Sequence, residues 1–343
     1  MFSIFRFIGG LGVGASTVAA PIFISEIAPA KDRGKLVALY QFNIVFGILI
    51  AFISNFLLKD FGTEPWRWMV GIEALPALIY FILVFLIPES PRWLITVKDN
   101  IEKAIPSLKI IEPDIPVEDQ IQKIKADHLN VVTSDTIWKP EYRFPVILAF
   151  LISFFNQFSG INAFLYYAPR IFEIAGLEKS GALLSSIGIG ITNLVFTYIG
   201  LMLIDRLGRR QLMYVGSIGY IVSLSLISMA FFMNMKGMAV PIFYFIFIAS
   251  HAIGQGTIIW VFISEIFPNH LRGQGTAFGT SIHWVLAAII PAMVPWLFKV
   301  IGPGTVFAVF AVMMVGQLIF TWKVMPETKG VSLEDIEKKL SSQ

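Results

Sequence analysis

The sequence of 343 residues contains no cysteine and little charge. Without cysteine no disulfide can form, so the sequence does not indicate a redox compartment. Charged residues make up 14% of the chain and lie in short segments between apolar runs. A membrane enzyme would need a nucleophile, a metal cluster or a nucleotide loop, yet the sequence has no paired histidine spacing and no Gly-x-x-x-x-Gly-Lys motif. We therefore expect no enzymatic activity, no cofactor, no metal and no nucleic-acid partner.

Hydrophobic residues dominate what is present. They form 56% of the chain, the mean hydropathy is +0.74, and phenylalanine alone contributes 31 residues. The apolar runs are about 20 residues long, enough for a helix to cross a bilayer and too long for barrel strands. The sequence therefore predicts an all-α polytopic membrane protein in a lipid bilayer. The nine predicted spans lie near residues 3–24, 36–58, 68–87, 145–168, 183–204, 211–233, 239–263, 275–298 and 304–325.

A repeated motif divides the chain into two related halves. Ser-Glu-Ile-x-Pro, followed by three residues and Arg-Gly, starts at Ser25 and again at Ser264, a period of 239 residues. A second pair agrees to within one residue, because the Pro-Glu-Ser that starts at Pro88 and the Pro-Glu-Thr that starts at Pro326 are 238 residues apart. Internal repeats of this size are typical of transporters.

The period also predicts that part of the first repeat is absent. The charged segment from Asp205 to Arg210 would have its counterpart before Met1, as would the apolar run that opens near Pro145. About three spans of ~20 residues each would fill this gap. We therefore expect a protein truncated at its N-terminus, with nine visible helices of an expected twelve. An inactive fragment is the alternative, because alternating access requires both repeats around one site.

Loop charge predicts the orientation of the spans, because cytoplasmic loops carry an excess of lysine and arginine. Basic loops alternate along the chain with loops that carry only scattered cations, and the C-terminus falls on the basic side. We expect the basic side, with the C-terminus, to be cytoplasmic. The predicted domains are residues 1–93 as the last three helices of an N-terminal bundle, 94–144 as a cytoplasmic linker, 145–330 as a C-terminal six-helix bundle and 331–343 as a cytoplasmic tail.

The linker is too polar to cross a membrane. Apolar residues recur at helical spacing between Ile101 and Leu108, which predicts short amphipathic helices under the bundle. A disordered linker is the alternative. The prolines expected to break the stretch into pieces are Pro106, Pro113 and Pro116.

Polar side chains inside apolar spans are the candidates for a solute pathway, because burying them is costly unless they face a cavity. Amides donate and accept hydrogen bonds without adding charge, which suits a neutral polyhydroxylated ligand. Tryptophan rings offer flat apolar surfaces for the C–H face of a pyranose. Each amide alone could instead serve an interhelical hydrogen bond. The candidate set is Gln41, Asn156, Gln157, Asn162, Tyr166, Asn193, Trp260, His283 and Trp284.

Within this set Gln157, Asn162 and Tyr166 approximate one helical face of the fourth predicted span, at offsets of five and four residues. His283 is interpreted as a neutral ring that forms a hydrogen bond, and His251 as a packing residue.

Five motifs occur in order along the chain: Arg6 with Gly9–Gly14, Pro88–Trp93, Gln157–Asn162, Asp205–Arg210 and Pro326–Gly330. Together they resemble the sugar porter family of the major facilitator superfamily, and the resemblance extends from Arg6 to Gly330. It implies a major facilitator fold and transport of a monosaccharide, a hexose or a pentose, by alternating access. It also implies that the hexose is held by Gln41, Gln157, Asn162, Asn193, Trp260 and Trp284, with Tyr166 close by.

Two positions depart from the family pattern. Asn156 stands where a second glutamine is common, and His283 stands where asparagine or glutamine is usual. Either change could alter which sugar fits.

Charged residues at the basic ends of the spans are candidates for a gating network. Arg209 and Arg210 can pair with acids such as Glu265 and Glu327, and matched acids recur in both repeats. The resemblance implies that such clusters tie the bundles in one access state and break in each cycle. Basic loop residues that serve topology alone are the alternative. The predicted network comprises Glu26, Arg33, Glu89, Arg92, Asp205, Arg206, Arg209, Arg210, Glu265, Arg272 and Glu327.

Two ionisable residues lie within spans and raise the question of proton coupling. Arg6 should not remain unpaired in a membrane, and the sequence offers it no obvious partner. Glu73 is expected to pair with Arg67, in preference to acting as a proton relay. In proton-coupled sugar porters, an acid on the first helix lies near the arginine that Arg6 resembles. That helix is expected to fall in the absent part of the first repeat, so symport and facilitated diffusion both stay open.

The remaining expectations concern the partners and the place of the protein. We expect a small-molecule sugar as substrate, with protons as a further candidate, and a monomer in a bacterial inner membrane. The short outer loops and their lack of Asn-x-Ser/Thr sites favour that membrane. A sugar sensor that binds without transporting is an alternative, although the tail is short for a signalling extension.

Overall fold

The computed structural model describes residues 1–28, 33–113, 115–129, 135–268 and 270–329, without the side chains of residues 25, 33–35, 37, 38 and 127–129. The basic loop after the first span, the Arg33 side chain and the tail 331–343 therefore lie outside the described residues.

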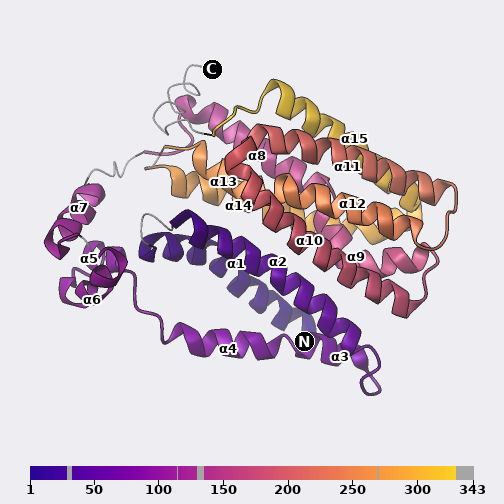
Figure 1. Cartoon of the computed structure of the whole chain (residues 1–343), viewed down its shortest axis with the longest axis horizontal. Coiled ribbons are helices and arrows are strands. Elements are labelled where there is room, and N and C mark those ends of the chain that lie inside the picture. Colours follow the sequence, from indigo (N-terminus) through magenta and orange to yellow (C-terminus); the bar gives the residue numbers. More distant parts are fainter. Residues whose placement is uncertain (29–32, 114, 130–134, 269, 330–343) are drawn as a thin grey trace. The chain divides into compact units, whose positions relative to one another are not determined.

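Throughout these ranges the chain is helical and without strands, and nine of its helices or helix pairs are long and apolar enough to cross a membrane. The predicted all-α fold with nine spans is therefore confirmed. The helices, labelled in Figure 1, are α1 (Phe2–Ile27), α2 (Arg33–Leu57), α3 (Pro65–Gly71), α4 (Ala74–Val84), α5 (Pro91–Thr96), α6 (Ile101–Ile111), α7 (Val117–Leu129), the 3₁₀ turn η1 (Pro140–Tyr142), α8 (Arg143–Phe158), α9 (Ile161–Ile174), α10 (Lys179–Leu207), α11 (Arg209–Phe232), α12 (Ala239–Ile253), α13 (Gln255–Glu265), α14 (Arg272–Val300) and α15 (Gly302–Lys323).

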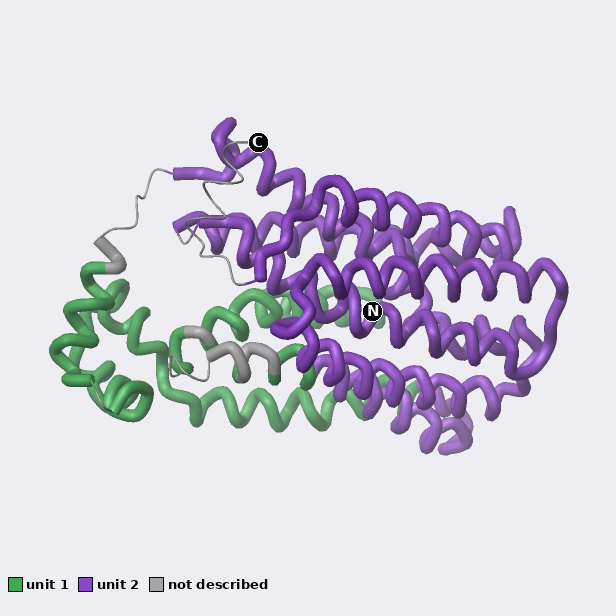
Figure 2. Tube along the Cα trace, turned by 45° about the horizontal axis from the view of Figure 1, so that its top comes forward, with its two compact units in different colours: residues 1–43, 67–134 green, residues 44–66, 135–343 purple. Residues whose placement is uncertain are grey.

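The chain forms two compact units, coloured separately in Figure 2. Unit 1 comprises residues 1–43 and 67–134, and unit 2 comprises residues 44–66 and 135–343. The division runs through α2. Its C-terminal half belongs to unit 2, where Lys59 Nζ, just after the helix, donates to Ser180 Oγ at 2.5 Å.

Three spans that the sequence presented as continuous are pairs of shorter helices. α3 and α4 are separated at residues 72–73, α8 and α9 at residues 159–160, and α12 and α13 at Gly254. Gly160 has φ +83°, a left-handed conformation that glycine adopts without the steric cost of a Cβ. The expectation of one continuous fourth helix was therefore wrong, because an apolar run gives no signal at the residue where its backbone turns.

Unit 2 is a bundle of α8 to α15 with two apolar cores. One core surrounds the fully buried Phe164, and the other surrounds Ile258 and Phe262. Between them α11 meets the α12–α13 junction backbone to backbone, since a methyl group on Gly216 would lie 2.9 Å from the Cα of Gly254. No larger residue fits this contact without moving α11.

Unit 1 contains a small helical cluster of α5, α6 and α7 after its apolar helices. The Ser90 hydroxyl accepts from the Trp93 N–H and so caps α5. Leu94 of α5, Leu108 of α6 and Ile124 of α7 form the apolar centre of this cluster. Pro106 lies inside α6 and does not end it. The interior proline costs about 3 kcal/mol, and the burial of α6 against α5 helps to offset that cost.

The segment that enters unit 2 at Asp135 is anchored to the start of α14. The Asp135 carboxylate contacts Lys139 Nζ at 2.7 Å and His270 Nε2 at 2.9 Å. The Gln274 amide makes two hydrogen bonds to the main chain of this segment. Its Nε2 donates to the Asp135 carbonyl, and its Oε1 accepts from the Ile137 N–H. Hydrogen bonds from Lys139 and His270 hold the pKa of Asp135 well below its ordinary value of 3.8. Because the carboxyl pKa is lowered in the fold, the ionised carboxylate stabilises the fold above pH 3.8, and this stabilisation is lost only as the pH falls below 3.8. The anchor is therefore formed at every physiological pH.

We predict that Asp135→Asn loosens this segment without affecting sugar binding. The amide keeps the shape of the carboxylate but removes the charge that Lys139 contacts. Limited proteolysis of the purified protein should cut near residue 135 several-fold faster in the variant. Asp60→Asn is the matched control, because Asp60 is an exposed acid whose contact with Lys59 is at 4.0 Å. Equal cleavage rates in Asp135→Asn and the parent would contradict the anchor.

Candidate functional site

The polar residues at the end of α8 form one hydrogen-bonded cluster around Gln157. Gln157 Nε2 donates to Asn156 Oδ1 at 3.0 Å and lies 3.1 Å from Nδ1 of His283, while Gln157 Oε1 accepts from Asn162 Nδ2 at 3.1 Å. Asn156, Gln157 and His283 are almost completely buried. The structure therefore brings four of the predicted sugar-binding residues, from α8, α9 and α14, into contact.

The break between α8 and α9 makes this cluster possible. The Ser159 hydroxyl donates to the Asn156 carbonyl at 2.6 Å and accepts from the Ile161 N–H, which holds the tight turn at Gly160. A Cβ at Gly160 would lie 2.7 Å from the ring of Phe164, so this residue must be glycine for steric as well as conformational reasons. The turn, and not a shared helical face, places Asn162 beside Gln157.

Aromatic rings border the cluster on the side of His283. The Trp260 ring centroid lies 4.9 Å from that of His283, and the Trp284 ring lies 5.2 Å away in an edge-to-face arrangement. Trp284 is 40% exposed within the molecule, so its ring is available to another apolar surface. Amides next to exposed aromatic rings are the combination that holds a neutral sugar.

The structure links the other three predicted sugar residues less directly to the cluster. Tyr166 lies one turn after Asn162 on α9 and is 60% exposed. Asn193 is buried on α10, where its Oδ1 accepts from Thr197 at 3.5 Å. Gln41 lies on α2 in unit 1 and is half-buried. Their part in sugar binding stays a prediction.

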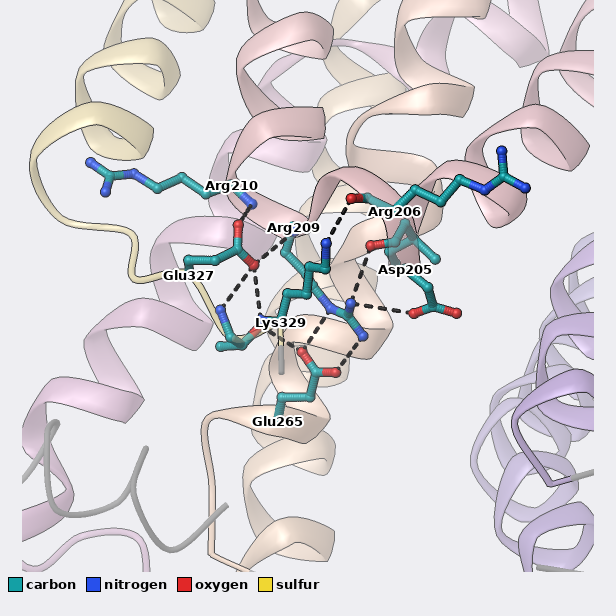
Figure 3. A network of polar contacts seen from close by, with 9 residues as sticks. Asp205, Arg206, Arg209, Arg210, Glu265, Glu327 and Lys329 are labelled. Atoms are coloured by element: carbon teal, nitrogen blue, oxygen red, sulfur yellow. Dashed lines mark hydrogen bonds and ion pairs between the residues drawn. The ribbon is translucent and has the colours of Figure 1, made fainter. Parts of the chain in front are cut away.

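A second polar site, the arginine network, lies where α10, α11, α13 and residues 326–329 meet (Figure 3). Arg209 makes a two-pronged ion pair with Glu265, with Nη2 to Oε1 at 2.7 Å and Nε to Oε2 at 3.1 Å. Its third nitrogen contacts Asp205 Oδ1 at 3.4 Å. The Arg209 side chain is only 11% exposed, so this pair is shielded from water more than an ordinary surface ion pair.

Glu327 binds main-chain groups in this network and not arginine side chains. Its carboxylate accepts from the N–H groups of Arg209 and Arg210 at the start of α11, each at 2.9 Å, and from those of Thr328 and Lys329. The first N–H groups of a helix have no partner within the helix and attract an anion. The Arg210 guanidinium extends away from Glu327 (Figure 3). It donates to the Thr321 and Trp322 carbonyls. The predicted pairing of their side chains is therefore corrected.

In the described ranges, no recorded side-chain hydrogen bond or ion pair joins the other predicted gating residues to the arginine network. Arg206 contributes its carbonyl, which accepts from Lys329 Nζ, and its side chain is exposed. The Nε of Arg272 is buried and has no hydrogen-bond partner among the described residues. In unit 1 Glu26 accepts from the Ser90 hydroxyl, and Glu89 and Arg92 are exposed. Every recorded member of the arginine network belongs to unit 2, and the tie between bundles stays a prediction.

Arg6 and Glu73 form an ion pair within unit 1. Arg6 Nη1 lies 2.9 Å from Glu73 Oε2. The sequence offered Arg6 no partner and favoured Arg67 for Glu73, and the recorded ion pair of Glu73 is with Arg6 instead. Both side chains are more than half exposed within the molecule. The pair joins α1 to the residue that precedes α4.

Sequence reasoning missed the buried polar chain that surrounds the α12–α13 junction. Gln255 Nε2 donates to Gln317 Oε1 at 2.6 Å, Gln317 Nε2 donates to Ser217 Oγ at 2.9 Å, and Tyr220 contacts both His251 and Gln255. Gln255 and Gln317 are fully buried. The signal was present, because each is a polar residue in an apolar span, but their pairing across 62 positions was not visible.

A helical membrane bundle with a buried amide and aromatic cluster, and with an arginine network at the helix ends, defines a membrane transporter of the major facilitator type. The family model described as "Sugar (and other) transporter" matches residues 1–340. The chain belongs to this family of sugar transporters, whose members are integral, multi-pass membrane proteins and not enzymes.

Individual relatives support the same assignment. The D-xylose-proton symporter of Escherichia coli strain K12 is 34% identical over 350 residues, which cover 98% of this chain and 71% of that protein. The glucose transporter GlcP of Staphylococcus epidermidis is 34% identical and matches 98% of this chain and 75% of that protein. Among solved structures, the inward-open xylose transporter XylE from E. coli matches with a TM-score of 0.85 at 32% identity, covering 98% of this chain and 73% of that chain.

Proposed function

We propose that the sugar transported is a neutral monosaccharide, a pentose or hexose such as D-xylose or D-glucose, held by the cluster around Gln157. The observation that carries this proposal is the buried Gln157–Asn156–Asn162–His283 contact beside Trp260 and Trp284. Amides and a neutral imidazole can exchange hydrogen bonds with several hydroxyls, and the indole rings can cover a C–H face. The names of the relatives, which include xylose and glucose transporters, favour these two sugars.

The arginine network is proposed to stabilise one access state on the cytoplasmic side, together with the predicted but untested residues Glu26, Arg33, Glu89, Arg92 and Arg272. Support comes from α13, which carries Trp260 in its middle and Glu265 at its end. A helix that touches both sites transmits a movement from one to the other, and the Arg209–Glu265 pair stabilises whichever state contains it.

Proton symport, with Arg6 and Glu73 as coupling residues, is the transport mode that we propose. The ion pair gives a membrane-embedded arginine an acid that can take up a proton, and relatives such as the D-xylose-proton symporter carry the coupling in their names. The remaining parts of this proposal are a monomer in the lipid bilayer of a bacterial inner membrane, with the C-terminus in the cytoplasm. The basic loops support that orientation.

The test is uptake of radiolabelled D-xylose and D-glucose by bacteria that lack their own carriers for both sugars and express this protein. We expect saturable uptake of at least one sugar, and we expect a protonophore to abolish its accumulation against a gradient. Equilibration that survives the protonophore would indicate facilitated diffusion. Binding to the purified protein, measured by tryptophan fluorescence, without any uptake would favour a sensor or an inactive fragment. The absence of both binding and uptake would refute the proposal.

A further inference from the structure

Tyr220 on α11 lies at the centre of the buried polar chain around the α12–α13 junction. Its phenol is fully buried, and its hydroxyl lies 2.5 Å from Nδ1 of His251 and 3.5 Å from Oε1 of Gln255. His251 belongs to the last turn of α12, and Gln255 is the first residue of α13. The hydroxyl of Tyr220 therefore contacts both sides of the break at Gly254.

The same hydroxyl reaches the other interrupted span of unit 2, which consists of α8 and α9. Ser159 follows the last residue of α8 and makes a side-chain hydrogen-bond contact with Tyr220. Ser159 is also fully buried, and its other two hydrogen bonds hold the turn from which α9 starts. One phenol on a continuous helix thus contacts the breaks of two other spans.

The polar partners of Tyr220 are tied back to α11 itself. The Gln255 amide donates to Gln317 on α15, and the Gln317 amide donates to Ser217. Ser217 lies three residues before Tyr220 on α11, so the hydrogen bonds return to the helix face on which they began. Such a ring of buried groups has few alternative arrangements, because a group that loses its partner stays out of water. The ring therefore fixes the start of α13 relative to α11.

Each element that Tyr220 contacts at a break carries a side chain of the cluster around Gln157. Asn162 is the second residue of α9, and Trp260 lies five residues after Gln255 on α13. No hydrogen bond or ring contact of Tyr220 with the cluster itself is recorded in the part of the chain that the structure describes. A buried group that sets the positions of two binding elements from behind acts on the geometry of the site.

We propose that Tyr220 is a positioning residue for transport, whose hydroxyl holds α9 and α13 at the spacing that the bound sugar requires. The inference rests on the proposed sugar site around Gln157. Packing alone needs only the ring of Tyr220, whereas the hydroxyl joins the two breaks. Without the hydroxyl the two elements are free of each other, and the sugar has to order them when it binds. That ordering lowers the affinity although no contact with the sugar is lost.

Tyr220→Phe keeps the ring and removes the hydroxyl. Isothermal titration of the purified full chain should show that this variant binds D-xylose or D-glucose, whichever the parent binds more tightly, about five- to tenfold more weakly. A loss of folded protein alone would lower the stoichiometry and leave the dissociation constant unchanged. Tyr244→Phe is the matched control, because Tyr244 is a buried phenol of α12 whose hydroxyl has no partner among the described residues. Its dissociation constant should equal that of the parent.

A double-variant cycle tests whether Tyr220 joins the two breaks. Ser159→Ala and Gln255→Leu each remove one end of the connection, so the second substitution finds it already broken. In the parent, the double variant should bind about fivefold more tightly than the product of the two single effects predicts. In the Tyr220→Phe background the same two effects should multiply to within about twofold, because the shared partner is gone.

An unchanged dissociation constant in Tyr220→Phe, or independent effects of Ser159→Ala and Gln255→Leu in a parent that binds sugar, would overturn this inference and leave the proposed sugar site standing. Coupling that persists in Tyr220→Phe would also overturn it, because another route would then join the breaks. If Tyr220→Phe fails to fold, the cycle in the parent decides alone. If the parent binds neither sugar, the proposed function fails and this inference fails with it.

Discussion

Replacing Gln157 with leucine is expected to lower the affinity for the transported sugar by about 100-fold. Gln157 is the residue through which Asn156, Asn162 and His283 contact one another. Leucine removes the hydrogen bonds of Gln157 to the sugar, at about 1 kcal/mol each, and leaves the buried amides of Asn156 and Asn162 without their partner. The remaining polar groups lose the arrangement that matches a ring of hydroxyls.

Isothermal titration of the purified protein with D-xylose and D-glucose measures this effect. Gln157→Glu is the informative second variant, because it keeps the size and the acceptor oxygen but cannot donate to Asn156 or His283. Its affinity should lie between those of the parent and Gln157→Leu. Gln211→Leu is the matched control, since Gln211 is an exposed residue on α11. A parent-like affinity of the folded Gln157→Leu protein would mean that the cluster is a structural contact and not the sugar site.

Much of the fold was predictable because lipid imposes strong constraints on composition. A bilayer requires about 20 apolar residues per helix, so nine spans could be counted directly from the sequence. The positions where spans break were not predictable. Gly160 and Gly254 both interrupt helices, whereas Gly188 and Gly190 lie inside the continuous α10. A glycine permits a turn, and tertiary contacts decide whether the turn forms.

The candidate sugar site was largely predictable because buried amides are conspicuous in apolar spans. Gln157, Asn162 and His283 were selected for their polarity, and the structure brings them together. Their contact nonetheless depends on the Gly160 turn, which no periodicity indicated. His251 lies next to Gly256 because of the break at Gly254, where α12 passes into α13, and no periodicity indicated that break either.

The arginine network shows a different limit of sequence reasoning. Opposite charges suggest pairs of side chains, but a carboxylate also finds donors in the main chain. Glu327 takes the N–H groups at the start of α11, and Arg210 turns to the carbonyls near the end of α15. Helix ends offer unpaired N–H and C=O groups that compete with charged side chains for the same partners. A sequence shows which residues are charged, but it does not show which helix ends lie close enough to bind them.

Arg209 pairs with Glu265 through its side chain, whereas Arg210 contacts Glu327 through its main chain, and double variants should distinguish the two cases. Arg209→Gln and Glu265→Gln remove the same two-pronged ion pair, so each should lower the unfolding temperature by about 3–4 °C, on the basis of ~2–3 kcal/mol for a partly shielded pair. The double variant should be little less stable than either single variant, because the second substitution removes only the secondary contacts of Arg209 with Asp205 or of Glu265 with the Thr328 hydroxyl. Thermal unfolding of the purified protein in detergent measures all three.

Arg210→Gln and Glu327→Gln should behave in the opposite way. Arg210 meets Glu327 through its main-chain N–H, which every residue except proline retains, so the two substitutions act on separate contacts. Their shifts in unfolding temperature should add, to within the ~0.5 kcal/mol that is usual for independent sites. Lys299→Gln, on the exposed last turn of α14, controls for the loss of a cation and should shift the temperature little. Strong coupling between Arg210 and Glu327 would contradict this prediction. It would indicate that the Glu327 carboxylate pairs with the Arg210 side chain, as expected from sequence, and not with the N–H groups at the start of α11.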